Sequence, residues 1–549
     1  MKIALAQQNY HIGNFNSNAA KIISAIERAK AEAVDLIVFP ELAVCGYPPL
    51  DFLEIKDFIQ KCEDSIQQIA QACVGIGAIV GAPRVNPEIE GKCLFNSAFL
   101  LHDGDVQGIS DKTLLPNYDV FDEYRYFESN RRFEVLCFQG KKIALTICED
   151  LWDVEDDLMY VRWPMDELVK QSPDVIINIA ASPFSEHHAL SRKKVLRHNA
   201  LKYLLPIIYV NHVGAQTELV FDGGSMVMNR QGKLVCELNY FQEDYRVIEL
   251  DWINTAKSFN VDADERIFKE NGIERIHHAL ILGIRDYFEK QGFRKAILGL
   301  SGGVDSALVY ALAVEAIGSE NVLGVLMPSP YSSQHSIDDS IKLAENLGAK
   351  ATILPIDQPF ESLKQTLSEQ FAGLEENVAE ENIQSRIRGV LLMAMSNKFG
   401  YILLNTSNKS ELAVGYGTLY GDMCGGLSVI GDLYKTRVYE LCRYINRNQE
   451  IIPEHILTKA PSAELRPNQK DTDCLPEYDV LDPLLEAYIE HQSGPETLIK
   501  MGFDEALVHR VLKMVNTNEY KRFQTAPILR VTPKAFGLGR RMPIVGKYW

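Results

Sequence analysis

The stretch LGLSGGVDSALVYALA, residues 298–313, places Gly, Ser and Asp between an apolar run and a run of helix formers. This pattern predicts a buried strand, a sharp turn and a helix, the arrangement of many phosphate-binding loops. Gly302 and Gly303 allow consecutive N–H groups to face anionic oxygens, while the nearby serines add hydroxyl donors. No Lys-[Ser/Thr] pair follows the glycines, so the stretch is not a Walker A loop. A glycine-rich turn without a ligand remains the simpler alternative for an isolated hexapeptide.

The stretch belongs to a longer alternation of strands and helices that starts near residue 267. Its apolar runs KAILGL, NVLGVLMP, KATILPI and GYILLNTS are separated by helical segments. We therefore expect a Rossmann-like doubly wound parallel sheet that binds ligands at the carboxyl ends of its strands. The preceding part alternates short β-branched runs with amphipathic segments, and hairpin-like pairs indicate a mixed sheet. The expected domains are residues 1–251 and 267–549, joined by a polar linker at 252–266.

Composition excludes several classes of protein. The 549 residues, 46% hydrophobic, suffice for several buried cores, and the net charge of −18 argues against a general nucleic-acid or anionic-membrane surface. The ten cysteines show no CxxC or Cys/His metal spacing, which favours reduced thiols and a cytoplasmic protein. No apolar run of about 18 residues and no secretory leader pattern occur, so we expect no membrane span.

Three residues of the first 150 combine the side chains that amide hydrolysis needs. Glu41 and Cys148 end apolar strands, and Lys112 opens a polar stretch. A carboxylate base, a thiol nucleophile and a cation that stabilises an oxyanion form a complete set for acyl transfer. Most buried cysteines are inert, but Cys148 ends a strand and two acids follow it, whereas Cys45 lies within a Gly-Pro loop.

The phosphate loop resembles that of synthetases that cleave ATP to AMP and pyrophosphate. Four downstream segments, at 382–397, 405–426, 430–441 and 461–482, together resemble the NAD synthetase family in its long glutamine-dependent form. This resemblance covers essentially the whole chain. It implies a nucleotide domain of the adenine nucleotide alpha hydrolase type, with ATP and Mg²⁺ taking part. Because glycine-dense segments are usually flexible, we expect residues 415–426 to form a mobile cover over the nucleotide site.

The resemblance assigns residues to each ligand of the second domain. For ATP it implies Leu300, Ser301, Gly302, Gly303, Val304, Asp305, Ser306 and Thr406. For deamido-NAD it implies Asn382, Glu411 and Lys521, and for magnesium Asp305 and Glu411. Because a carboxylate in the first helical turn also stabilises the helix dipole, both roles of Asp305 remain open.

The segments around Glu41, Lys112 and Cys148 resemble the amidase branch of the nitrilase superfamily, which implies an αββα sandwich. In that resemblance Glu41 is the general base, Cys148 the nucleophile and Lys112 the oxyanion stabiliser, with Glu123 orienting the lysine. Glutamine contacts are implied for Tyr118 and Ser182. His188 stands where the family often has a lysine, so it is the candidate for the substrate carboxylate. A metal role for His187 and His188 is disfavoured, because adjacent histidines rarely converge on one ion.

These observations predict a ligase that takes nitrogen from glutamine and amidates adenylated deamido-NAD. The expected partners are glutamine, deamido-NAD and ATP, without nucleic acid or membrane. The family resemblance also implies a homo-oligomer and an internal ammonia tunnel. Two alternatives are another glutamine-fed adenylating amidotransferase with a different acceptor, and a chain in which one half is only a regulatory module.

Overall fold

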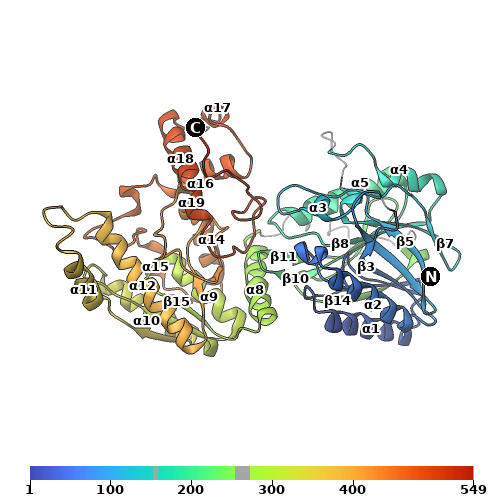
Figure 1. The fold of residues 1–549 in the computed structure, drawn as a ribbon, viewed down its shortest axis with the longest axis horizontal. Coiled ribbons are helices and arrows are strands. Elements are labelled where there is room, and N and C mark those ends of the chain that lie inside the picture. The colour runs from blue at the N-terminus through green and yellow to red at the C-terminus, as the bar shows by residue number, and fades with distance from the viewer. Residues whose placement is uncertain (89, 153–158, 254–271, 548–549) are drawn as a thin grey trace. The chain divides into compact units, whose positions relative to one another are not determined.

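The computed structural model describes residues 1–88, 90–152, 159–253 and 272–547 (Figure 1). The chain divides into two compact units, Met1–Glu270 and Asn271–Trp549. Of the predicted linker, residues 254–266 lie outside the described residues, while Trp252 and Ile253 belong to helix α6 (Leu250–Ile253).

The first unit is built on two six-stranded sheets that share an apolar core. One sheet has the order β14-β1-β2-β3-β4-β5 and the other β13-β12-β9-β8-β7-β6. The strands of the first sheet are β1 (Lys2–Gln7), β2 (Leu36–Val38), β3 (Gly77–Val85), β4 (Leu94–His102), β5 (Asp105–Asp111) and β14 (Asp244–Glu249). Those of the second are β6 (Leu136–Phe138), β7 (Lys141–Ile147), β8 (Val175–Ala180), β9 (Ile207–Asn211), β12 (Met226–Met228) and β13 (Leu234–Glu237). A separate hairpin pairs β10 (Val213–Gln216) with β11 (Leu219–Asp222).

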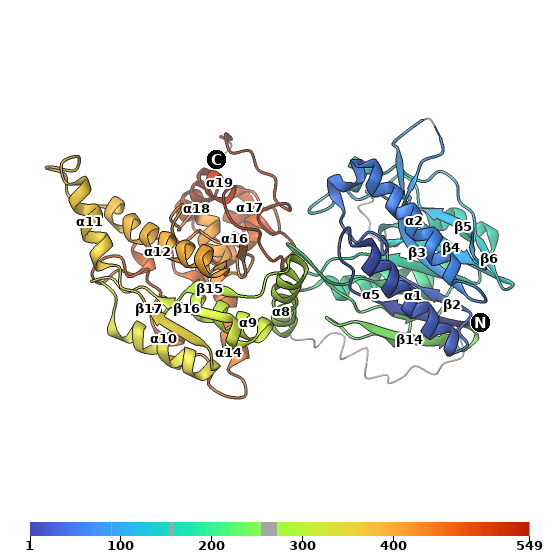
Figure 2. The ribbon, with the colours of Figure 1, turned by 60° about the horizontal axis from the view of Figure 1, so that its bottom comes forward.

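Helices cover the outer faces of this sandwich, as Figures 1 and 2 show. Long helices α1 (Phe15–Ala31) and α2 (Lys56–Ala72) pack their apolar side chains on the first sheet, and α4 (Pro164–Leu168) and α5 (His188–Tyr203) lie on the second. Short turns complete the unit: η1 (Leu50–Glu54), α3 (Glu123–Tyr126), η2 (Cys148–Leu151) and η3 (Val169–Gln171). The expected mixed sheet is confirmed, because β7, β8 and β9 run parallel while β6–β7 and β12–β13 are antiparallel.

The second unit contains a five-stranded, wholly parallel sheet in the order β17-β16-β15-β18-β19. Helices α11 and α12 lie on one face and α9 and α10 on the other (Figure 2), so the sheet is doubly wound as expected. The elements are α8 (Gly272–Gln291), β15 (Ala296–Gly299), α9 (Val304–Ile317), η4 (Ser319–Asn321), β16 (Val322–Leu326), α10 (Gln334–Leu347), β17 (Lys350–Ile353), α11 (Asp357–Leu367), α12 (Val378–Phe399), β18 (Ile402–Asn405), α13 (Lys409–Val414) and β19 (Leu427–Ser428).

A helical subregion with its own apolar core completes the second unit. It is formed mainly by α16 (Tyr478–Ile489), α17 (Pro495–Lys500) and α18 (Glu505–Thr517). The remaining elements are α14 (Lys435–Ile445), α15 (Glu454–Thr458), η5 (Asp471–Asp473) and α19 (Glu519–Arg522).

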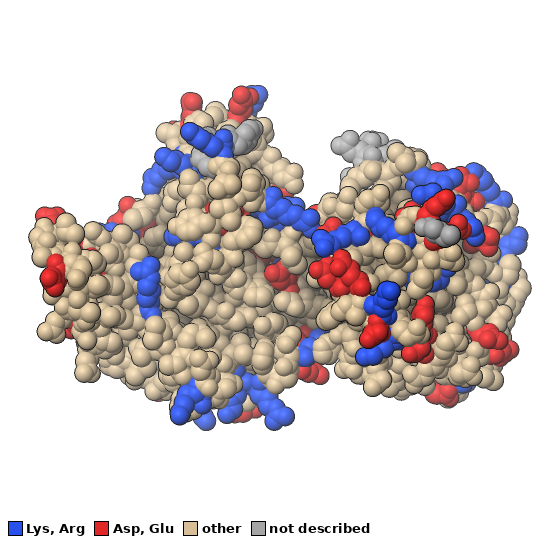
Figure 3. Space-filling view, viewed as in Figure 1, with Lys and Arg blue, Asp and Glu red and all other residues tan. Residues whose placement is uncertain are grey.

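Charged side chains of both signs are intermixed on the face of each unit seen in Figure 3, without a continuous basic surface there. Within the described ranges, no helix has the length and hydropathy needed to cross a membrane.

Candidate active sites

Cys148 occupies a sharp turn at the carboxyl end of β7. Its φ of +43° is a left-handed conformation, which residues other than glycine rarely adopt and which is concentrated at functional sites. The Asp150 carboxylate fixes this turn by accepting hydrogen bonds from the backbone N–H groups of Ile147 (3.0 Å), Thr113 (3.0 Å) and Leu114 (2.9 Å). The Asp150 carboxylate therefore ties the turn that carries the thiol to the segment that follows Lys112.

Lys112 bridges two carboxylates in the interior beside this turn. Its Nζ lies 2.7 Å from Glu41 Oε1 and 2.8 Å from Glu123 Oε1, and the Lys112 and Glu41 side chains are wholly buried. The backbone N–H of Ala181 donates to the other Glu41 oxygen at 2.9 Å. The structure thus brings Glu41, Lys112, Glu123 and Cys148 together.

Burial sets the charge states of this cluster. It raises the pKa of the Cys148 thiol well above its ordinary value, and Glu41 raises it further, while Lys112 lowers it. Burial also raises the pKa of Glu123 to about 7, against the opposing effect of Lys112. A thiol of this kind needs a neighbouring base before it becomes a nucleophile.

The residues expected to contact glutamine lie in two places beside the cluster. Tyr118 donates its hydroxyl proton to Glu149 Oε1 at 2.9 Å, and Tyr160 donates to the same oxygen at 3.1 Å. Ser182 Oγ lies 2.8 Å from His188 Nε2, and the His188 ring stacks on Trp152 with 4.7 Å between centroids. No group of three or more potential metal ligands from His, Cys, Asp and Glu occurs in the described part of the chain, including around His187 and His188.

Three further residues of this site were not predicted from the sequence. Tyr47 donates to Glu123 Oε1 at 2.8 Å, and Asn96 donates to Glu41 Oε1 at 2.7 Å. Glu149 is the shared acceptor of the two tyrosines. An amide inside an apolar strand is the signal that would have drawn attention to Asn96, because buried polar side chains need partners.

The phosphate loop of the second unit connects β15 to α9. Gly302 has a φ of +75°, and a Cβ added there would lie 2.6 Å from the Ser336 Cα, so this position requires glycine. Ser301 Oγ and Ser306 Oγ lie 3.1 Å apart, and Ser306 Oγ also donates to the Gly303 carbonyl at 3.1 Å. The loop therefore presents an organised turn at the N-terminus of a 14-residue helix.

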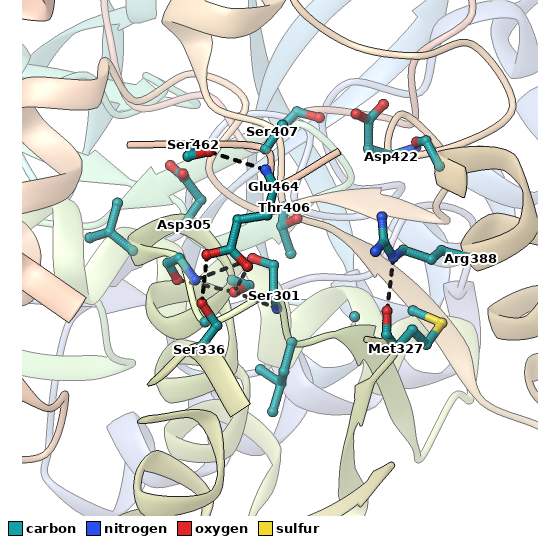
Figure 4. A pocket seen from close by; sticks show the side chains of 18 of the residues that line it. Ser301, Asp305, Met327, Ser336, Arg388, Thr406, Ser407, Asp422, Ser462 and Glu464 are labelled. Carbon is teal, nitrogen blue, oxygen red and sulfur yellow. Dashed lines mark hydrogen bonds between the residues drawn. The ribbon is translucent and has the colours of Figure 1, made fainter. Parts of the chain in front are cut away.

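A cavity of about 270 Å³ opens over this loop (Figure 4). Ser301, Asp305 and Thr406 lie close together at one part of it, and Arg388 and Asp422 lie at the opposite side. Of the predicted residues, the wall contains Leu300, Ser301, Gly302, Gly303, Val304, Asp305, Ser306, Thr406 and Glu411.

Asn382 and Lys521 are not among the residues that line this cavity. Asn382 Oδ1 accepts a hydrogen bond from Thr418 Oγ1 at 2.8 Å. Lys521 Nζ donates to the carbonyls of Gly415 and Gly417 at 2.7 and 2.8 Å. Both side chains therefore support the glycine-dense segment in this structure.

The glycines of that segment serve close packing. A Cβ at Gly421 would lie 2.3 Å from Ser385 Oγ, and one at Gly425 would lie 2.8 Å from the Asn405 Cβ. The Asp422 backbone N–H donates to Ser385 Oγ at 2.9 Å. Close contact with α12 and β18 thus gives these two glycines a packing role.

Asp305 and Glu411 converge on a buried ammonium group. Lys435 Nζ contacts Asp305 Oδ2 and lies 3.4 Å from Glu411 Oε1, while Asn408 Nδ2 donates to Asp305 Oδ1 at 2.9 Å. Burial raises the pKa of Glu411 to about 8, against the opposing effect of Lys435. Two oxygen ligands beside a phosphate loop fit Mg²⁺, which often binds through one or two carboxylates together with substrate phosphates.

The two units define a class of enzyme: a nitrilase-like sandwich with a cysteine–carboxylate–lysine cluster, joined to a parallel-sheet unit with a phosphate-loop cavity. The carbon-nitrogen hydrolase model matches residues 2–257, and the NAD synthase model matches residues 276–525. The predicted fold class is thereby confirmed.

Full-length relatives identify the family. The glutamine-dependent NAD(+) synthetase of Synechocystis is 47% identical, over 99% of this chain and 98% of its own length. That of Thermotoga maritima is 41% identical, over 100% and 99%. The solved structure of the Acinetobacter baumannii enzyme in complex with ADP is 39% identical, with a TM-score of 0.77 over 99% of this chain and 98% of its own. The chain belongs to the glutamine-dependent NAD(+) synthetases, as predicted.

Proposed function

We propose a division of labour in which residues 1–251 hydrolyse glutamine and residues 267–549 use the ammonia to amidate deamido-NAD that has been adenylated with ATP. The products are glutamate, NAD, AMP and pyrophosphate. The observation that carries this proposal is the coexistence, in one chain, of the buried Cys148 cluster and the phosphate-loop cavity.

In the amide-hydrolysing unit, Glu41 takes the proton of Cys148, and the thiolate attacks the side-chain amide carbonyl of glutamine. The Lys112 ammonium, which has a third N–H beyond those directed at Glu41 and Glu123, stabilises the resulting oxyanion. Glu41 returns its proton to the leaving nitrogen, which departs as ammonia and leaves a thioester. Water deprotonated by Glu41 hydrolyses the thioester to glutamate and restores the thiol.

In the synthetase unit, the loop from Ser301 to Ser306 holds the ATP phosphates, with Thr406 as a further contact. Asp305 and Glu411 would hold Mg²⁺, which supplies charge neutralisation between ATP and the carboxylate of deamido-NAD. Ammonia must arrive uncharged, because ammonium has no lone pair with which to attack the adenylate. Contacts of Asn382 and Lys521 with deamido-NAD, implied by the family, would require the glycine-dense segment to rearrange.

Product analysis tests the overall reaction. Purified protein given glutamine, ATP, Mg²⁺ and deamido-NAD is expected to form NAD and pyrophosphate, measured by chromatography. Formation of a different amidated nucleotide without NAD would favour the alternative acceptor. If the unmodified protein does not catalyse one of the two partial reactions, the corresponding unit is only a regulatory module.

His188 is proposed to contact the glutamine carboxylate together with Ser182. His188→Ala is expected to raise the KM for glutamine about tenfold, because a hydrogen bond to a charged ligand is removed. The matched control is His187→Ala, which alters an exposed neighbour. An unchanged KM in the His188 variant would remove the residue from the binding site.

Glutamine hydrolysis is expected to decline as pH falls through about 7, where Glu123 gains a proton. The protonated carboxyl no longer carries the charge that holds Lys112 in place. Steady-state glutaminase rates across this range measure the effect, and Glu123→Gln, which is neutral throughout, should remove this part of the pH dependence. An unchanged decline in that variant would exclude Glu123 as its source.

Two general properties are also proposed. A cytoplasmic location fits the nucleotide substrates and the ten free cysteines. A homo-oligomer is supported by family resemblance and is tested by light scattering of the purified protein.

A further inference from the structure

Asn96 lies in the interior of the first unit, on strand β4, with no exposed surface. Its side-chain amide reaches both carboxylates of the catalytic cluster. Nδ2 donates to Glu41 Oε1 at 2.7 Å and to Glu123 Oε2 at 3.4 Å. The backbone of the same residue accepts from the Lys112 N–H at 2.8 Å. One strand residue thus contacts the predicted base, the second glutamate and the lysine between them.

The orientation of this amide is determined by charge. Turning it by 180° would point its oxygen at two carboxylates, which is unfavourable while both are ionised. In the observed orientation Asn96 Oδ1 is buried and has no hydrogen-bond partner among the described residues. Leaving a buried acceptor unpaired is costly, so packing alone does not explain an asparagine here. The gain lies in the two N–H groups directed at Glu41 and Glu123.

We propose that Asn96 is a positioning residue for glutamine hydrolysis, which keeps Glu41 and Glu123 together in the ionised, hydrogen-bond-accepting state that proton removal from Cys148 requires. This inference rests on the proposed role of Glu41 as the general base. Lys112 supplies one positive charge for two negative ones, and the Asn96 amide offsets part of the remaining repulsion without adding charge.

Other groups also lie against Glu41, in addition to these two N–H groups. The Glu41 carboxylate also accepts a hydrogen bond from the Ala181 backbone N–H, and the backbone carbonyl oxygen of Glu41 lies 2.6 Å from His212 Nε2. Its ionisable neighbours are Lys112, Glu123, Cys148 and Tyr47. Of these, Lys112 alone carries a positive charge.

The test compares variants of the full-length protein that keep the shape of the side chain. Asn96→Leu removes both N–H groups, and Asn96→Asp adds a third carboxylate. Each is expected to lower glutaminase kcat/KM about 10- to 100-fold and to move its acid limb upward by at least about half a pH unit, more for aspartate. The matched control is Ser97→Ala on the same strand, whose hydroxyl donates to Asp111 at 2.5 Å. Its acid limb should stay in place.

A second readout follows Cys148 without turnover. The pH dependence of its alkylation by iodoacetamide, measured by peptide mass spectrometry, should shift in the same direction in both Asn96 variants. The proposal is overturned if Asn96→Asp has the same acid limb and the same alkylation profile as the unmodified protein. It is also overturned if kcat/KM falls equally at every pH, with no shift of the acid limb. If the leucine variant does not fold, as judged by thermal unfolding, the aspartate variant decides. Glutamine hydrolysis that survives Cys148→Ala would instead contradict the proposed function itself.

Discussion

Replacing Cys148 with alanine is expected to reduce glutamine-dependent NAD formation on the order of 10³-fold or more, while synthesis from added ammonium salts stays within about twofold. The variant loses the proposed nucleophile, without which no thioester forms. The lining residues of the phosphate-loop cavity, as far as the structure describes the chain, belong to the second unit, so the variant retains them. Rates of NAD formation with each nitrogen source, measured on the same preparation, give the comparison.

The matched control is Cys45→Ala, a second buried cysteine of the same unit. Its Sγ contacts the backbone carbonyls of Leu42 and Gly46 at 3.7 and 3.4 Å, so its loss should leave use of glutamine nearly intact. A Cys148 variant that loses both nitrogen sources would argue against two separable reactions. One that still uses glutamine would exclude Cys148 as the nucleophile.

Gly302→Ala is expected to reduce NAD formation about 100-fold with either nitrogen source, while glutamine hydrolysis persists. Alanine at a φ of +75° is strained by about 1–2 kcal/mol, and its Cβ would collide with the Ser336 backbone at 2.6 Å. The loop would have to move, and its N–H groups would lose the proposed contact with the ATP phosphates. Pyrophosphate release and glutamate release, assayed separately, distinguish the two units.

Gly303→Ala is the matched control in the same loop. Gly303 has a φ of −97°, and the nearest atom to an added Cβ is Ser301 Oγ at 3.2 Å. This change should cost no more than about tenfold. Equal losses in the two variants would show that the left-handed conformation of Gly302 is not what the loop requires.

Local patterns predicted the strands and helices well where the chain alternates clearly. The turn after β15 and the parallel sheet around it follow from apolar runs and helix formers in sequence, and α9 begins at Val304, directly after the glycines of the predicted turn. The antiparallel pair of β6 and β7 agrees with the hairpin-like pairs predicted for the first unit. Residue type and position singled out Glu41, Lys112, Cys148 and the loop glycines, whereas the family resemblance supplied the other candidate residues of the two sites.

Contacts between residues far apart in the chain could not be predicted from local sequence patterns. The partners of Lys435 are Asp305, 130 positions away, and Glu411, 24 positions away. Asn382 and Lys521, which are predicted to contact deamido-NAD, form hydrogen bonds in this structure with the segment that starts at Gly415. Residue types alone do not say which charges pair, because that depends on how strands from different parts of the chain are placed.

The sequence by itself determined the two α/β units, the phosphate turn and the family, because each depends on local periodicity or on a run of neighbouring residues. Only the tertiary structure decided that Asn96 joins Glu41 and Glu123, that Lys435 lies between two carboxylates, and that Cys148 adopts a left-handed turn. Burial is the physical reason: once these groups leave water, each must find its partners within the fold, and the fold alone determines which are in reach.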